Sequence, residues 1–495
     1  MGDMDRRDFM IAALGGAGLL GASGLLGTSS ALASILPEAT ATVYTRRNVY
    51  CLNAYSREIV AYKAAINAMR ALPDTNGISW MAQANIHGAT APPAGMITDV
   101  CEHGQLFFLS WHRMYVYFFE RIVRKMSGDA NFALPYWGYS PTGARNLPAF
   151  FRSPATANNP LYTSNRNASI NAGNPITASL VDAGGALAQT AFFDFTNSVN
   201  SIPHGQVHVA VGGGMSSFEE AGRDPIFWLH HCNIDRLWEL WLASGGGRAN
   251  PTTNTTWMTT SFSFYDENGA TVSLTGAQIV DTACQLRYQY ESDVCGRVIV
   301  FDPRWWRRFS RIPIPPEMLI ARLDSLGTRP PRPDPLPLAQ APETVRLGGQ
   351  AVNVALPFSA EGKRILAALP RDAQVGGQIT LVFENIQVEG TPRVAYEIYV
   401  NLPADVRSPA YTSPHYVGNV NLFGPSPRGP HAAKRENQIV PLSLAYLRLR
   451  EAKHWSDDAV RVTFIPRSLT EGQDPARTLG QRTQVTIGRM SVQVQ

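Results

Sequence analysis

The stretch that decides the fold is Asp224-Pro225-Ile226-Phe227-Trp228-Leu229-His230-His231-Cys232-Asn233-Ile234-Asp235-Arg236-Leu237-Trp238. An aspartate followed by a proline is a typical helix start, and the apolar run after it predicts a helix that ends near Leu242, before a triple glycine. Asp235 comes four residues after His231 and shares its helix face, where a carboxylate could hold the ring of a metal ligand. Taken alone, the stretch also fits a buried helix with two hydrogen-bonded core histidines.

The other histidines decide between these two interpretations. Seven of the ten fall into two groups of three or four, which scattered structural histidines would not do. The sequence therefore predicts a metal site in two parts. The ten are His87, His103, His112, His204, His208, His230, His231, His415, His431 and His454.

The first group surrounds the start of a predicted helix over residues 105–126. His103 and His112 are nine residues apart, about 900° of helical rotation, so they would face opposite sides of one continuous helix. If both bind one metal, His103 must precede the helix, and Gly104 makes that break plausible. The third histidine of this group, His87, comes earlier in the chain, in a Gly/Ala/Pro-rich stretch that we predict as a loop. Cys101 is placed either to supply a thiolate ligand or to modify His103 covalently.

The second group adds a His-x-x-x-His pair, His204 and His208, to the histidines of the opening stretch. The pair lies on one helical face, and Pro203 suits the first turn of that helix. Two all-histidine sets without a carboxylate ligand favour copper over calcium, magnesium or a His/carboxylate iron site, and disfavour a dizinc or di-iron hydrolase. Such a metal pair with open positions can bind O2.

The N-terminus has the pattern of an export signal. Arg6 and Arg7 precede a charge-free stretch rich in Gly and Ala, and Ala31-Leu32-Ala33 fits a cleavage site. Residues 1–33 are therefore predicted to be a twin-arginine signal, and the protein to be exported to the periplasm or secreted. A membrane anchor is the alternative, but the apolar core is short for one, and no other stretch is long enough to span a membrane.

The rest of the 495-residue chain exceeds what one core usually supports, so more than one domain is expected. We predict a catalytic domain over 34–310, a Pro-rich linker over 311–345 and a β-rich domain over 346–495, with strands near 379–383 and 460–465. A net charge of +4 argues against nucleic-acid binding. Five sparse cysteines do not make a disulfide framework, although Cys284 and Cys295 could pair.

These motifs resemble the type-3 copper family of tyrosinases, catechol oxidases and molluscan haemocyanins. The resemblance implies a mainly α catalytic domain, a four-helix bundle around a dicopper site, followed by an all-β, sandwich-like C-terminal domain. Of the adjacent pair it selects His231 as a ligand and makes His230 a neighbour, and it makes Cys101 the partner of a thioether to His103. The implied ligands are His87, His103 and His112 for one copper, and His204, His208 and His231 for the other.

The resemblance also implies roles for residues around the metals. Phe218 matches a bulky gate over the first copper, Phe227 matches a ring packed on the second copper's histidines, and Asp235 matches part of the supporting shell with Asn233 and Arg236. Tyr288-Gln289-Tyr290 resembles a Tyr-x-Tyr motif that an arginine near the start, Arg46 or Arg47, usually holds.

Two positions depart from the family pattern. Asn200 stands where plant members often have a glutamate that holds a water, and Gly205 stands where bacterial tyrosinases often have asparagine. Both departures weaken the expectation of phenol hydroxylation and leave catechol oxidation untouched. Glu219 or Glu220 could substitute for the missing glutamate.

The activity implied by the resemblance is oxidation of o-diphenols to o-quinones with O2 as co-substrate, with ortho-hydroxylation of monophenols as a second activity. The alternatives are a catechol oxidase without that second activity and a haemocyanin-like O2 carrier. The expected partners are small phenols and catechols, with no nucleic acid and no membrane anchor. The C-terminal domain is expected to dock on the active site as a lid, with Tyr411 as the candidate side chain.

Overall fold

The computed structural model describes residues 42–104, 106–297, 336–368, 379–424, 437–475 and 484–494. The predicted export signal and most of the predicted linker lie outside these residues. Among the helices in the described ranges, none has both the length and the apolar character needed to cross a membrane.

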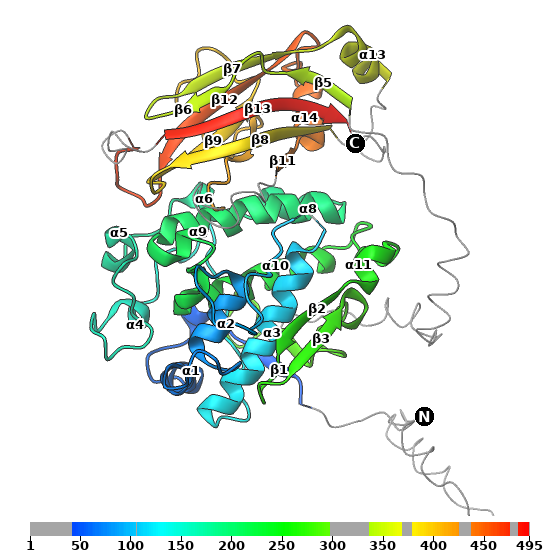
Figure 1. Cartoon of the computed structure of the whole chain (residues 1–495). Helices are drawn as coiled ribbons and strands as arrows, with labels where there is room; N and C mark the ends of the chain where they lie inside the picture. The colour runs from blue at the N-terminus through cyan, green and yellow to red at the C-terminus, as the bar shows by residue number, and fades with distance from the viewer. Residues whose placement is uncertain are drawn as a thin grey trace, which may run out of the picture. The chain divides into compact units, whose positions relative to one another are not determined.

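The first part of the described chain is mainly helical, coloured blue to green in Figure 1. Its long helices are α1 (Arg57–Arg70), α3 (Phe108–Ser127) and α10 (Pro225–Ala243), and α3 packs against both of the others. The shorter helices are α2 (Trp80–His87), α4 (Ala149–Arg152), α5 (Ala168–Ala172), α6 (Ala178–Val181), α7 (Gly184–Leu187), α8 (Phe192–Val199), α9 (Gln206–Val211) and α11 (Thr255–Thr259). Single turns are η2 (Val49–Cys51), η3 (Asn200–Gly205), η4 (Gly213–Ser216), η5 (Ala221–Arg223) and η6 (Gly276–Gln278).

Helix α10 confirms the prediction from the opening stretch. The Asp224 carboxylate accepts the Ile226 N–H at 3.1 Å, and Pro225 occupies the first helical position, where its missing N–H costs nothing. The other side of the Asp224 carboxylate is held by the buried Arg166 guanidinium at 2.7 and 2.8 Å. An apolar surface on nearly every side keeps this helix in the centre of the core.

Three local predictions around the histidines had different outcomes. Helix α3 begins at Phe108, so His103 does precede it. His87 is the last residue of α2 rather than a loop residue, because Ser79 caps this helix and its apolar residues are buried. The chain bends at Ile202, which is extended, and His204 therefore lies in the π-helical turn η3 before α9. Pro203 is within that turn instead of at the start of a regular helix.

Two small sheets complete the helical part. Strand β1 (Tyr44–Arg46) pairs in parallel with β4 (Tyr288–Tyr290), and β2 (Ser261–Tyr265) forms a hairpin with β3 (Thr271–Thr275). A disulfide joins Cys51 to Cys295, so the suggested pair of Cys284 and Cys295 is wrong. The two ends of the helical part are thereby linked twice, by a strand pair and by a covalent bond, and spacing along the chain could not reveal either one.

The C-terminal part, coloured yellow to red in Figure 1, confirms the β-sandwich prediction. One sheet has the order β10-β9-β12-β7 and the other β11-β8-β13-β5, with β6 also paired to β13. Phe383 of β8 and Phe464 of β12 meet across the two sheets, with ring centroids 5.8 Å apart. The strands are β5 (Leu336–Gln340), β6 (Val345–Leu347), β7 (Val352–Pro357), β8 (Ile379–Glu389), β9 (Val394–Val400), β10 (Tyr416–Asn419), β11 (Gln438–Pro441), β12 (Ala459–Ser468) and β13 (Gln484–Val494), with helices α13 (Ala360–Ala368) and α14 (Ser443–Glu451).

The end of the predicted linker belongs to this sandwich. Residues 336–340 form β5, although the prolines of the region suggested an extended linker up to 345. Strand β5 ends the strand order of its sheet, and edge strands tolerate proline because one side of the backbone needs no ladder hydrogen bond.

The end of β12 contacts the helical part. Ile176 and Thr470 form an isolated antiparallel bridge, and the Thr177 hydroxyl donates to the Ser468 carbonyl at 2.6 Å. Arg145 forms an ion pair with Glu471 beside this bridge. These contacts fix one side of the β-sandwich to the segment between α5 and α6.

Candidate metal centre

The structure brings the histidines of both predicted groups together. The ligand atoms of each group lie within 4.8 Å of one another. The two groups adjoin, because the rings of His112 and His231 stack with centroids 4.4 Å apart and an interplanar angle of 6°. The first group is His87, Cys101, His103 and His112, and the second is His204, His208, His230 and His231.

Backbone carbonyls orient four of the rings. The Nδ1 atoms of His112 and His208 lie 2.7 Å from the carbonyls of Phe108 and Met215. A carbonyl can only accept, so each Nδ1 carries the proton and each Nε2 keeps its lone pair for a metal. The same arrangement holds for His87 with the Phe218 carbonyl at 2.9 Å and for His204 with the Asn200 carbonyl at 3.3 Å.

The freed nitrogens point into a common space. His208 Nε2 and His231 Nε2 are 3.3 Å apart, and His204 Nε2 is buried with no hydrogen-bond partner in the described part of the chain. A buried imidazole nitrogen without a partner is costly unless a ligand satisfies it. The donor set therefore fits a metal that prefers imidazole ligands, such as copper.

Burial keeps these imidazoles neutral. It lowers the pKa of His112, His204, His208 and His231 well below the usual value, and the neighbouring histidines lower it further. A protonated imidazole cannot coordinate a metal, so this environment holds the rings in the form that binds one.

The adjacent histidines His230 and His231 differ in their contacts. The Nδ1 of His230 is 2.8 Å from the Tyr139 hydroxyl, while the Nε2 of His231 faces His208. Burial lowers the pKa of His230 to about 3, against the opposing effect of the His204 backbone. His230 therefore packs on the site with its Nδ1 engaged by a side chain from outside the two groups.

Cys101 lies against the ring of His103. Its sulfur is 3.3 Å from His103 Nδ1 and 3.7 Å from Nε2, and 3.5 Å from His112 Nε2. The two His103 nitrogens flank Cε1, so the sulfur is beside the part of the ring where a thioether would form. The same position would also allow Cys101 to be a thiolate ligand. The geometry is compatible with a thioether and with a thiolate ligand.

The predicted aromatic and polar neighbours surround the two groups. Phe218 stacks on His103, with centroids 4.2 Å apart and an angle of 15°. Phe227 contacts His231 at 4.3 Å and also His87 of the first group at 5.0 Å, so it packs on both groups rather than on the second alone. The Asn200 amide donates to the His103 carbonyl at 3.0 Å and connects η3 to the loop before α3.

A side chain that the sequence analysis missed covers this space. Phe423, after β10, stacks on His208 with centroids 3.9 Å apart and an angle of 10°, and its ring is 4.7 Å from that of Phe218. The suggested Tyr411 is wrong, because its ring packs on Tyr416 of β10 instead. The apolar pair Leu422-Phe423 was the available sequence signal, and it has no periodicity to distinguish it.

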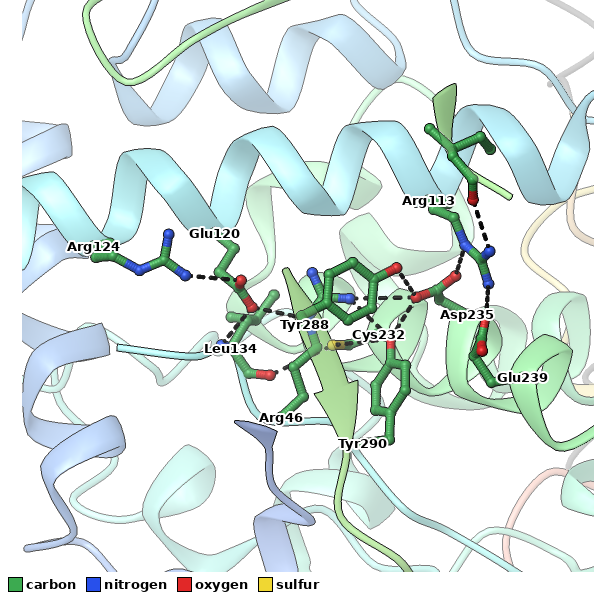
Figure 2. Close-up of polar contacts among 11 residues, drawn as sticks. Arg46, Arg113, Glu120, Arg124, Leu134, Cys232, Asp235, Glu239, Tyr288 and Tyr290 are labelled. Atoms are coloured by element: carbon green, nitrogen blue, oxygen red, sulfur yellow. Dashed lines mark hydrogen bonds and ion pairs between the residues drawn. The ribbon is translucent and has the colours of Figure 1, made fainter. Parts of the chain in front are cut away.

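Asp235 has a different role from the one its spacing suggested. Its carboxylate binds Arg113 at 2.5 Å and Arg46 at 3.3 Å, and accepts the hydroxyls of Tyr288 and Tyr290, instead of holding the ring of His231 (Figure 2). The reason is competition, since two buried guanidinium groups attract a carboxylate more strongly than a neutral imidazole does.

The network around Asp235 extends in both directions along α3. Arg46 also binds Glu120 at 2.8 Å, and Arg113 binds Glu239 at 2.6 Å (Figure 2). Burial alone would raise the pKa of Asp235, but Arg113 and Arg46 outweigh burial and hold that pKa below its usual value. Arg46, rather than Arg47, is therefore the arginine of the Tyr-x-Tyr motif.

Comparison with known proteins places this centre in a family. Residues 78–185 and 152–244 match the model of the common central domain of tyrosinase, 252–297 match the polyphenol oxidase middle domain, and 337–495 match a domain of unknown function. A tyrosinase of Hahella sp. is 27% identical over 90% of this chain and 98% of its own length. The latent form of polyphenol oxidase of Prunus armeniaca is 27% identical over 83% of this chain and 70% of its own.

Solved structures share the fold. A latent aurone synthase, itself a polyphenol oxidase, is 23% identical and superposes with a TM-score of 0.61, covering 92% of this chain and 90% of its own. A latent apple tyrosinase superposes with a TM-score of 0.57 at 23% identity, covering 92% of this chain and 97% of its own.

The fold and the site define a protein with a helical domain that gathers two histidine-rich groups able to hold metal ions, followed by a C-terminal β-sandwich. The chain belongs to the type-3 copper family of tyrosinases and polyphenol oxidases, and it carries a C-terminal domain. The family consists of dicopper proteins, and its enzymes are oxidases.

Removing the Asp235 carboxylate tests the network. Asp235→Ala leaves Arg46 and Arg113 buried beside each other without their shared partner, so we expect a loss of about 3–5 kcal/mol in the free energy of unfolding. Denaturant unfolding of the metal-free chain measures it. As a control, Asp129→Ala removes the partner of the exposed Arg57 and should cost at most about 1 kcal/mol. Equal losses for the two variants would contradict the role of Asp235.

Proposed function

We propose that this protein oxidises o-diphenols to o-quinones with O2 at a copper pair. The observation that carries the proposal is the pair of adjoining histidine groups in which four Nδ1 atoms face backbone carbonyls and leave the Nε2 atoms of those rings for a metal. Two catechols release four electrons and four protons, which reduce one O2 to two waters, so the reaction balances without another reductant.

The proposed ligands divide between the two groups as the family motif implies. Copper held by them would supply the electron transfer between the phenol and O2. The six ligands are His87, His103 and His112 in one group, and His204, His208 and His231 in the other.

The chain contributes orientation and exclusion of water. The carbonyl contacts hold four imidazoles in one tautomer, and burial lowers the pKa of His204 and His208 and so keeps them neutral. Phe423 already stacks on His208, which shows that this face accepts a flat aromatic ring. We infer that a phenol ring binds in the same place, between His208 and Phe218.

We further propose that ortho-hydroxylation of monophenols is a second, weaker activity. A monophenol must lose its hydroxyl proton before it reacts, and a carboxylate or a water held by one would accept it. The Asn200 amide has no such capacity, and it donates to the His103 carbonyl. Glu219 directly follows the gate residue Phe218 and is the candidate carboxylate. It is buried and accepts the Ser217 hydroxyl at 2.7 Å.

We propose that the C-terminal sandwich keeps the enzyme latent and that Phe423 is its blocking side chain. Phe423 is buried against rings of both histidine groups, at 3.9 Å from His208 and 5.7 Å from His103. A phenol cannot stack on His208 while Phe423 does.

We also propose that residues 1–33 direct export by a twin-arginine route, which carries folded proteins.

Replacing a proposed ligand tests the metal site. His208→Ala should lose the second copper and abolish quinone formation, because the remaining two ligands leave that ion incompletely held. Metal analysis and a catechol oxidation assay measure the two effects. His415→Ala, a histidine of the β-sandwich bonded to the Val400 carbonyl, serves as the control and should keep both coppers. Normal catechol oxidation by His208→Ala would disprove the proposed site.

The proposed thioether has a mass signature. Forming a bond between Cys101 Sγ and His103 Cε1 removes two hydrogens, and copper-loaded protein exposed to O2 supplies the oxidant. Mass spectrometry of a tryptic digest should show the one peptide that contains both residues about 2 Da lighter than its sequence requires. Cys101→Ala should abolish this loss of mass, whereas Cys232→Ala should keep it. A peptide of unchanged mass from the loaded wild type would exclude the thioether.

Truncating the blocking side chain tests latency. Phe423→Ala should raise catechol oxidation by the full-length, copper-loaded chain without proteolysis, chiefly through a lower KM, because the face of His208 becomes accessible. Initial rates over a range of catechol concentrations measure the change. Tyr411→Ala removes another aromatic ring of the same domain and should behave like the wild type. If both variants matched the wild type, Phe423 would not be the block.

A further inference from the structure

Gly205 lies between the two histidines of the His-x-x-x-His pair. The backbone conformation at this position does not require a glycine. Its φ of −63° and ψ of −34° are ordinary helical values that any residue adopts. Glycine in a helix costs up to about 1 kcal/mol relative to alanine, so its presence here needs another cause.

The cause is a side chain from the β-sandwich. A Cβ added at Gly205 would lie 2.0 Å from Oδ1 of Asn421, 2.7 Å from its Cγ and 3.0 Å from its Nδ2. These are the three nearest atoms, and all belong to this one residue. Any side chain at position 205 would therefore displace the Asn421 amide.

That amide is bonded to the backbone of Phe423. Asn421 Oδ1 accepts the Phe423 N–H at 3.1 Å, a turn that sets the direction in which the Phe423 ring leaves the chain. The Asn421 N–H in turn donates to the side chain of Gln438 at 2.8 Å. Displacement of the amide therefore breaks the hydrogen bond that orients the ring stacked on His208.

Residues just before Asn421 also bond to η3 and α9. The Ser201 hydroxyl donates to the Asn419 carbonyl at 2.9 Å, and the Gln206 amide donates to the Val420 carbonyl at 2.9 Å. Gln438 of β11 closes the arrangement with a bond to the Asn419 carbonyl at 2.7 Å. The segment 419–423 thus lies along η3 and the start of α9, and Gly205 lies in the middle of this contact.

We propose that Gly205 is the docking position for the segment 419–423, and that Asn421 is the positioning residue that directs Phe423 onto His208. The absence of a side chain at 205 is a requirement of docking rather than of the oxidation chemistry. Any larger residue at 205 releases the segment. The consequence for latency rests on the proposed function, but the docking does not.

A double-mutant cycle on the full-length, metal-free chain tests the proposal. Hydrogen–deuterium exchange of residues 416–424 reports docking. Gly205→Ala should speed their exchange by about tenfold or more, since it removes the docked state while keeping helical geometry. Asn421→Ala removes the atoms that clash, so adding Gly205→Ala to it should have almost no further effect. Equal effects of Gly205→Ala in both backgrounds, or none in the wild type, would overturn the proposal.

The control is Gly185→Ala in α7, where an added Cβ meets nothing within 4 Å. It should leave the exchange of residues 416–424 unchanged. Exchange of α3 and α10 must stay protected in Gly205→Ala, which distinguishes release of the segment from unfolding. Because these measurements use no copper, a Phe423→Ala variant that loads copper but forms no quinone would disprove the proposed function and leave the docking result standing. In an active enzyme, Gly205→Ala should raise catechol oxidation in the same direction as Phe423→Ala.

Discussion

The carboxylate of Asp235 is the contact on which the geometry of the metal centre depends. It joins β1 through Arg46, α3 through Arg113, and β4 through Tyr288 and Tyr290. Arg113 follows the proposed ligand His112, and Asp235 itself lies one turn after His231 on α10. Because the network is buried, removing one partner would leave a charge without compensation. The stacking of His112 on His231, and with it the position of one histidine group beside the other, follows from how this network holds α3 against α10.

The sequence could predict the features that depend on residues close to each other in the chain. The cap and first proline of α10, the break before α3 and the two histidine groups all depend on residues within one or two helical turns. The partner of Asp235 was predicted wrongly because helix spacing reveals which residues share a face but not which distant cation competes for them. The carbonyls that fix the ligand tautomers were equally hidden, since a backbone group has no sequence signal of its own.

Contacts over long sequence separations account for the rest. The Cys51–Cys295 disulfide and the stacking of Phe423 on His208 each connect segments about 200 or more residues apart. Neither follows a periodic pattern, so composition and spacing favour a nearer or more conspicuous residue, such as Cys284 or Tyr411. Gly205 shows the same limit from the opposite side. Glycine at this position departs from the family pattern, and the sequence alone suggested that the departure affects the chemistry. The structure instead shows the atoms of Asn421 beside the position.

The docked segment and the second histidine group share one stretch of backbone. Ser201, Gly205 and Gln206 contact residues 419–421, and His204 and His208 alternate with them along the same turns. A conformation of this stretch that holds the two proposed ligands in place is therefore also the one that accepts the segment. Since coupling between two binding events is reciprocal, an ion held by His204 and His208 would favour docking, and docking would favour the ion. A cover built on these turns would then protect a metal pair best when that pair is complete.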